Sequence, residues 1–227
     1  MPTPNQVVKQ INDRIHRLVR SGLADNQLTA FQRKNGRRVE IVFPNAEYIS
    51  TVLKNIDYVD MYRILVRQRA YNLKMCDGAL IQMTYDFSDR TLVRHRLAFL
   101  PAPHLDEFQK APETYLDDEL HGDVVARNVI PFPFRYDYDA RAGRHQPLEH
   151  PLSHLTLGQY ERCRMPVSAP VTPNWFVDFV VRNFYHTATR RYADGMPAGG
   201  AVFDEVILPE ERRVVHVTIP GRTSRLR

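Results

Sequence analysis

Lysine, cysteine and long apolar runs are scarce in this chain of 227 residues. Its two cysteines, Cys76 and Cys163, lie far apart and follow no zinc-ligand or disulfide spacing, so we expect two reduced thiols. No apolar run approaches the roughly 20 residues that a membrane-spanning helix needs. The first residues also lack the basic and apolar regions of a signal peptide. We therefore expect a cytoplasmic protein that has no membrane as a partner.

Arginine accounts for most of the basic residues, because only five of the 31 lysines and arginines are lysine. Guanidinium groups bind phosphate through a rigid planar fork, so an arginine-rich surface is compatible with nucleic acid as a partner. A GC-rich coding genome also replaces lysine by arginine without a functional reason, and the composition alone leaves both explanations open. The formal net charge is +5.

One segment is strongly acidic, since residues 101–123 hold seven acidic residues against a single lysine. Residues 101–122 are also rich in proline and predict an acidic surface loop with at most one short helix. Such a loop could act as a lid, bind a partner, compete for the basic surface, or simply be solvated. Residues 221–227 predict a basic, frayed tail.

Apolar periodicity and turn signals predict one α+β domain over residues 1–227, with a mostly antiparallel, twisted sheet built from hairpins. Helices are expected at residues 5–21, 46–56 and about 172–187, the last beginning at Thr172-Pro173. Residues 58–75 fit either a helix or a strand. Hairpins are expected over residues 27–43, 79–100, 124–160 and 202–219.

The hairpin that contains residues 132–160 carries the first candidate site. Side chains alternate along a strand, so Arg135, Asp137 and Asp139 share one face, while His154 and Thr156 share a face of the second strand. Carboxylates and an imidazole brought together in this way suit acid–base catalysis. Asp137 and Asp139 could also hold a divalent metal such as Mg²⁺ or Mn²⁺. The alternative is a twisted hairpin whose charges face water and whose His154 is an inert core imidazole.

A second candidate is a repeated pair of residues. His154 and Thr156 recur as His216 and Thr218, each pair within an apolar run. If both pairs faced one cavity, they would resemble a phosphoesterase of the two-histidine kind. One histidine would act as base and the other as acid, and the threonines would hold phosphate oxygens.

Three arginines are candidates for binding phosphate at this site, besides Arg135. Arg162 and Arg164 follow the His154 strand and would lie at its rim. Arg182 lies four residues after Asp178 on the helix expected from Thr172. It forms either a surface ion pair with Asp178 or, if that face meets the hairpin, a phosphate clamp.

Several short motifs between residues 135 and 185 are similar to a bacterial family of unknown function. They are Arg135-Tyr136-Asp137-Tyr138, His150-Pro151-Leu152-Ser153-His154-Leu155-Thr156-Leu157-Gly158, Cys163-Arg164-Met165-Pro166-Val167, Phe176-Val177-Asp178-Phe179 and Asn183-Phe184-Tyr185. The resemblance implies a bacterial protein encoded among defence or mobile-element genes. It implies no established activity.

The residues favour a phosphodiester-cleaving enzyme, a nuclease or phosphoesterase, that acts on nucleic acid or nucleotides in a bacterial defence or toxin setting. His154 would be its acid or base, Asp137 would orient His154 or bind metal, and Arg135 and Arg164 would bind phosphate. His216 would be the second catalytic histidine if the two-histidine arrangement holds. A rival is a non-enzymatic accessory subunit that binds a larger protein and nucleic acid. A third is a regulator, such as an antitoxin, whose acidic loop mimics phosphate.

Overall fold

The computed structural model describes residues 1–49, 56–103, 132–159, 162–185 and 200–221. The predicted acidic loop and basic tail fall almost wholly outside these ranges, as does much of the helix expected at residues 46–56. The strands are β1 (Ala24–Gln27), β2 (Phe31–Asn35), β3 (Arg38–Val42), β4 (Leu73–Met75), β5 (Leu80–Ser88), β6 (Thr91–Leu100), β7 (Phe134–Asp139), β8 (Ser153–Leu157) and β9 (Arg164–Pro166).

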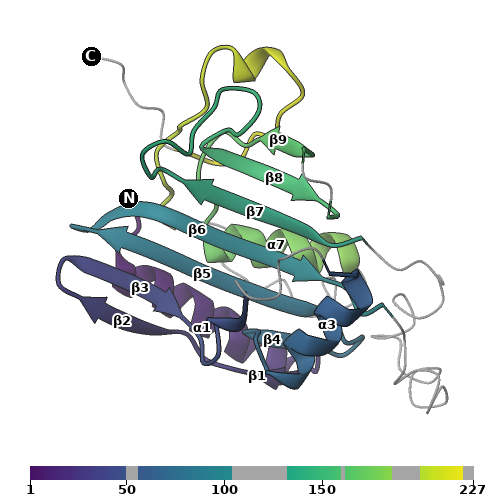
Figure 1. The fold of residues 1–227 in the computed structure, drawn as a ribbon. Coiled ribbons are helices and arrows are strands. Elements are labelled where there is room, and N and C mark those ends of the chain that lie inside the picture. The colour runs from purple at the N-terminus through teal and green to yellow at the C-terminus, as the bar shows by residue number, and fades with distance from the viewer. Residues whose placement is uncertain (50–55, 104–131, 160–161, 186–199, 222–227) are drawn as a thin grey trace.

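These strands form one nine-stranded sheet, whose main path runs in the order β1-β4-β5-β6-β7-β8-β9, and each described pair of neighbouring strands is antiparallel (Figure 1). The β2–β3 hairpin joins the sheet through β3, which pairs with one half of β5 while β4 pairs with the other half. The predicted α+β class and mostly antiparallel sheet are therefore confirmed.

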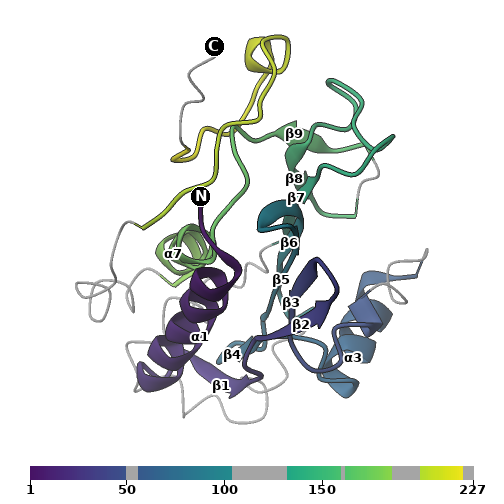
Figure 2. The same ribbon diagram turned by 90° about the vertical axis from the view of Figure 1, so that its left-hand side faces the viewer.

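Two helices cover one face of the sheet: α1 (Pro4–Arg20) and α7 (Pro173–Phe184) (Figure 2). Each begins after a threonine that accepts a hydrogen bond from the first turn, with proline directly behind it. Thr3 forms a full capping box with Gln6. Both helices lie where the sequence predicts them. None of the described helices is long and apolar enough to cross a membrane.

Alternation along the strands separates the apolar face from a polar face. In β7, Phe134, Tyr136 and Tyr138 are buried in the main core, and the tyrosine at 136 packs edge-on against Trp175 and Phe176 of α7. The residues between them, Arg135, Asp137 and Asp139, lie on the opposite face. The packing of α1 and α7 thus determines which side chains remain for the other side of the sheet.

The third helix, α3 (Tyr58–Arg67), covers only one end of this opposite face (Figure 2). Its Met61 and Leu65 form a small apolar cluster with Leu80, Ala98 and Leu100 of β5 and β6. Residues 58–75, which fit a helix or a strand by sequence, therefore contain both, since α3 is followed by β4. Away from α3 the same face carries charged residues.

The hairpin expected over residues 202–219 is wrong. The described residues there form a short 3-10 helix, Glu211–Arg213, and no strand pair. Glu211 is 1% exposed and its Oε2 accepts a hydrogen bond from the backbone N–H of Leu208, which closes a compact turn where a hairpin loop was expected. Val217 instead makes an isolated parallel bridge to Val167, just after β9.

His95 of β6 ties the sheet to the segment before α7. Its ring is 1% exposed, and its Nε2 accepts a hydrogen bond of 2.9 Å from the backbone N–H of Val171. An accepting Nε2 carries no proton, so the ring is neutral in this arrangement. Burial lowers the pKa of His95 to about 3 and outweighs the opposing charge of Asp137.

Because His95 is buried, we predict that acid destabilises the protein already at pH values well above the pKa of carboxylates. The unfolded chain takes a proton on His95 below about pH 6.5, whereas the folded chain does not, so stability present above that pH is lost as the pH falls. Between pH 6.5 and 4.5 the His95→Gln variant should lose about 2 kcal/mol less free energy of unfolding than the unmodified protein. Urea unfolding at several pH values measures this, and parallel pH profiles for the two proteins would contradict it.

Candidate functional site: an arginine pocket

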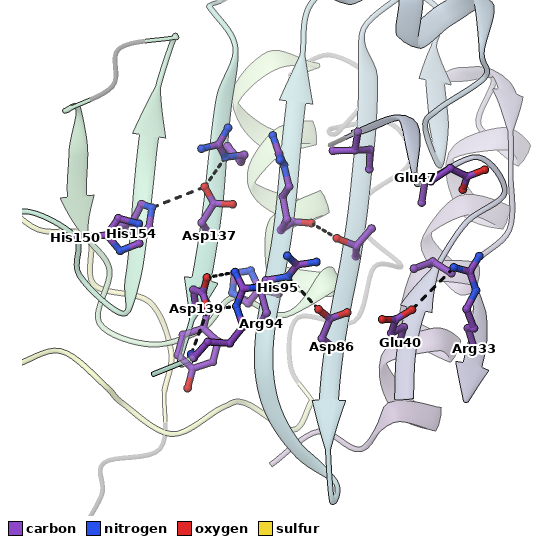
Figure 3. Close-up of a pocket in the computed structure, with 18 of the residues that line it drawn as sticks. Arg33, Glu40, Glu47, Asp86, Arg94, His95, Asp137, Asp139, His150 and His154 are labelled. Carbon is purple, nitrogen blue, oxygen red and sulfur yellow. Dashed lines mark hydrogen bonds and ion pairs between the residues drawn. The ribbon is translucent and has the colours of Figure 1, made fainter. Parts of the chain in front are cut away.

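A pocket of about 510 Å³ lies on the polar face of the sheet, where α3 does not cover it (Figure 3). Residues of β2, β3 and β5 to β9 line it, together with parts of the neighbouring loops. We call it the arginine pocket because six arginines line it: Arg33, Arg94, Arg96, Arg135, Arg141 and Arg164. Glu40, Glu47, Asp86, Asp137 and Asp139 also line it, so its charges are mixed.

The register of the strands brings these charges together. Arg96 of β6 is paired with Asp137 of β7, which is in turn paired with His154 of β8. One step along, Arg94 is paired with both Asp86 and Asp139. Paired residues on neighbouring strands lie side by side, so acids and bases alternate across the face. The 3.0 Å contact from Arg94 Nε to Asp86 Oδ2 follows from this arrangement.

His154 forms part of the pocket wall, although its ring is almost completely buried at 2% exposure. Its Nδ1 lies 2.9 Å from the backbone oxygen of Pro151. A carbonyl can only accept a hydrogen bond, so Nδ1 carries the proton and the neutral ring keeps a lone pair on Nε2. Nε2 lies 3.8 Å from Oδ2 of Asp137 (Figure 3). The ring is thus part of a concave surface, as expected, but is far less open to solvent than an exposed cleft would make it.

The protonation state of His154 suits a base. Burial lowers its pKa below the usual value for histidine, and this effect is stronger than the opposing effect of Asp137 and of the hydrogen bond to Pro151. Neighbouring His150 and Arg135 lower it further. At neutral pH the ring is therefore uncharged and able to take a proton on Nε2.

Asp137 is held in its ionised form by its neighbours. Burial alone would raise its pKa, but the nearby Arg135, Arg96 and His154 outweigh burial and lower the pKa below the usual value. Arg135 Nε donates a short hydrogen bond to Oδ2 of Asp137. The carboxylate therefore fixes Arg135 and can stabilise a positive charge that forms on His154.

Arg96 keeps one donor without a partner. Its Nε is buried and makes no hydrogen bond to any described residue. Burial and the neighbouring Arg135 lower the pKa of Arg96 to about 9, despite the opposing charge of Asp137, so it stays charged at neutral pH. A buried donor without a partner costs free energy, which an anion in the pocket would recover.

A second imidazole touches the first. The ring centroids of His150 and His154 are 4.9 Å apart, edge to face. His150 is the more exposed of the two, and its buried Nδ1 has no hydrogen-bond partner among the described residues. Burial and nearby Arg164 lower its pKa. The structure therefore pairs His154 with His150, four residues earlier, within one pocket.

The other predicted residues occupy different places. His216 follows the Glu211–Arg213 turn, where its Nδ1 donates to the carbonyl of Val214, and neither it nor Thr218 lines the arginine pocket. Neither of the two pockets found within the described ranges holds both His154 and His216, and among the described residues His216 lies outside any strand. Thr156 lies on the same face as His154, but its buried hydroxyl has no hydrogen-bond partner in the described part of the chain and does not line the pocket.

Arg182 is also remote from the arginine pocket, because α7 covers the opposite face of the sheet (Figure 2). Its Nε makes a 2.8 Å ion pair with Asp178 one helical turn earlier. Of the two interpretations of Arg182, a surface ion pair or a phosphate clamp, the structure contains the surface ion pair.

The donor groups do not fit a divalent metal. Asp137 is bonded to Arg135, and Asp139 accepts hydrogen bonds of 2.8 and 2.6 Å from Arg141. Within the described residues, no three carboxylate, imidazole or thiol groups gather closely enough to hold a metal ion. The predicted Mg²⁺ or Mn²⁺ site at Asp137 and Asp139 therefore gains no support.

A protein-family model described as "Uncharacterized conserved protein (DUF2290)" matches residues 23–219. The chain belongs to this family. The match confirms the predicted resemblance to a family of unknown function and extends it from residues 135–185 over most of the chain. No curated protein and no solved structure matches the chain significantly.

The family match brings no site residues with it, so the pocket rests on geometry alone. Sequence reasoning missed Arg94, Arg96 and Asp86, which complete it. The signal was present in β6, where two arginines alternate with His95 and Leu97 and must share a face. What the sequence did not show is that β6 lies between β5 and β7.

The electrostatic coupling in the pocket can be measured directly. Asp137 raises the pKa of His154, so Asp137→Asn should lower that pKa further. Arg135 lowers it, so Arg135→Gln should raise it. NMR titration of the imidazole Cε1–H reports both, and Lys9→Gln, on exposed α1, serves as a control that should change nothing. A His154 pKa that moves in neither variant would contradict the geometry.

Proposed function

We propose that the arginine pocket binds a phosphodiester of a nucleic acid or nucleotide, and that His154 starts its cleavage as general base. One observation carries this proposal: a neutral imidazole with its Nδ1 tied to Pro151 presents Nε2 within a pocket lined by arginines. A base must be uncharged at working pH and held in one orientation, and this ring meets both requirements.

The arginines supply binding and charge stabilisation. Arg96 has a buried donor to offer, and Arg164 lines the pocket beside the two histidines. Both can contact phosphate oxygens, where guanidinium groups form charge-assisted, often bidentate hydrogen bonds. Arg135 contributes its charge while Asp137 keeps it in place. Fixed donors of this kind need no rearrangement when negative charge develops on the phosphate.

His154 and Asp137 carry out the proton transfer from the nucleophile. His154 takes that proton, and Asp137, 3.8 Å from Nε2, stabilises the imidazolium that results. The leaving oxygen takes its proton from solvent, because burial and Arg164 lower the pKa of His150 as well, so this second ring is also uncharged at neutral pH. His154 thus acts without the second catalytic histidine, His216, that was expected from sequence.

The burial of His154 favours a second candidate function. A ring that is 2% exposed and bonded to the main chain also suits a structural role. The arginine pocket would then belong to a non-enzymatic accessory subunit that binds nucleic acid for a larger partner. The cytoplasmic location expected from the first residues and the lack of apolar runs fits both functions equally. So does a bacterial defence or mobile-element setting, which the family resemblance implied.

The His154→Asn variant separates the two functions. The amide nitrogen of asparagine can still donate to the Pro151 carbonyl, whereas the Nε2 base is removed, so the fold should keep its stability. Cleavage of fluorescent RNA and DNA oligonucleotides should fall about 10²–10⁴-fold.

A matched control is His16→Asn, since His16 is exposed on α1, away from the pocket. It should cleave at the unmodified rate. Thermal unfolding of both variants checks that the fold is intact. Unchanged cleavage by a folded His154→Asn variant would remove the enzymatic proposal, and binding without any cleavage by the unmodified protein would favour the accessory subunit.

A further inference from the structure

We infer that the nucleophile is the 2′-hydroxyl of the substrate itself, which makes RNA the substrate class of the arginine pocket. This inference rests on the proposed function, because it assumes that the pocket cleaves a phosphodiester. It goes further by stating where the attacking oxygen comes from, and the composition of the pocket argues for it in three steps.

Side chains that could act as the nucleophile are scarce in the arginine pocket. No serine or cysteine is among the described residues that line the pocket. Its two hydroxyl groups belong to Thr84 and Tyr138. Thr84 donates to the backbone oxygen of Arg96, and burial together with Asp139 raises the pKa of Tyr138, which keeps its hydroxyl protonated. No hydrogen bond joins either hydroxyl to an imidazole or a carboxylate of the described residues, so a covalent intermediate with the protein is not favoured.

Water is the next possible nucleophile. Activating water for attack on a phosphodiester commonly uses one or two metal ions held by carboxylates. Here Asp137 and Asp139 are each bonded to an arginine, and the described part of the chain offers no group of three metal-binding side chains. The donor set consists of imidazoles and guanidiniums, which suits proton transfer and anion binding.

The remaining nucleophile is a hydroxyl group of the substrate. A ribose 2′-hydroxyl is already attached next to the phosphorus that it attacks, so its reaction is intramolecular and gains the large advantage of proximity. It needs a base to take its proton and positive groups to stabilise the phosphorus centre. His154 Nε2 and the pair Arg96 and Arg164 supply these two requirements.

The reaction balances without consuming water or a co-reactant. His154 Nε2 takes the 2′-hydroxyl proton as the bond from O2′ to phosphorus forms. The bond from phosphorus to O5′ breaks, and O5′ leaves with a proton from solvent. The products are a 2′,3′-cyclic phosphate and a 5′-hydroxyl, after which His154 returns its proton to solvent and so balances the proton given to O5′.

A chimeric oligonucleotide tests this inference. A DNA strand with a single ribonucleotide should be cut only on the 3′ side of that ribose, and mass spectrometry should find the cyclic phosphate. Replacing the ribose by deoxyribose or a 2′-O-methyl sugar should slow cleavage by about 10³-fold or more. The His154→Asn protein, purified in the same way, excludes a contaminating ribonuclease.

Paired variants link the chemistry to the pocket. Arg96→Gln should reduce cleavage of the chimera at least tenfold, whereas Arg182→Gln, on the far side of the sheet, should leave it unchanged. Equal cleavage of the all-DNA strand, or products that carry a 5′-phosphate and a 3′-hydroxyl, would overturn the inference and leave the proposed function standing. Cleavage of neither strand would overturn both.

Discussion

The antiparallel register of β6, β7 and β8 is the constraint on which the site depends. Because α1 and α7 bury one set of alternating side chains, the other set must lie together on the opposite face. Arg96, Asp137 and His154 therefore meet across three strands that are joined through long stretches of chain. A slip of one residue in any strand would turn its charged groups into the apolar core, so the core enforces the geometry of the pocket.

The local parts of the fold could be predicted because their causes are local. Thr3 and Thr172 cap helices within one turn, and Asn35-Gly36 bends a hairpin within two residues, with Gly36 at a positive φ of 57°. The hairpin at residues 202–219 failed for one reason inside its own sequence and one outside it. Glu211 closes the turn with Leu208, and Val217 finds its partner at Val167, some fifty residues earlier. Apolar alternation indicates a strand but does not name its partner.

The candidate site shows the same division. The shared face of Arg135, Asp137 and Asp139 follows from their spacing, and so does the face of His154. The order β5-β6-β7 does not follow from residue spacing. Only this order places Arg94 and Arg96 of β6 next to Asp137 of β7. The burial of His154 could not be predicted from the sequence either, because it results from packing around the whole pocket. That burial decides the chemistry, since it keeps the ring neutral where Asp137 alone would favour the charged form.

The central claim is that phosphate binds among Arg96, Arg164 and His154, and NMR of the arginine Nε–H and histidine Cε1–H groups tests it most directly. A dinucleotide with a 2′-O-methyl group presents the phosphodiester without being cleaved. Titrating it into the protein should shift the resonances of Arg96, Arg164 and His154 in a saturable way. Arg182 on α7, which does not line the pocket, should stay unchanged. Saturable binding that leaves Arg96 and His154 unshifted, or that shifts Arg182 instead, would contradict the account.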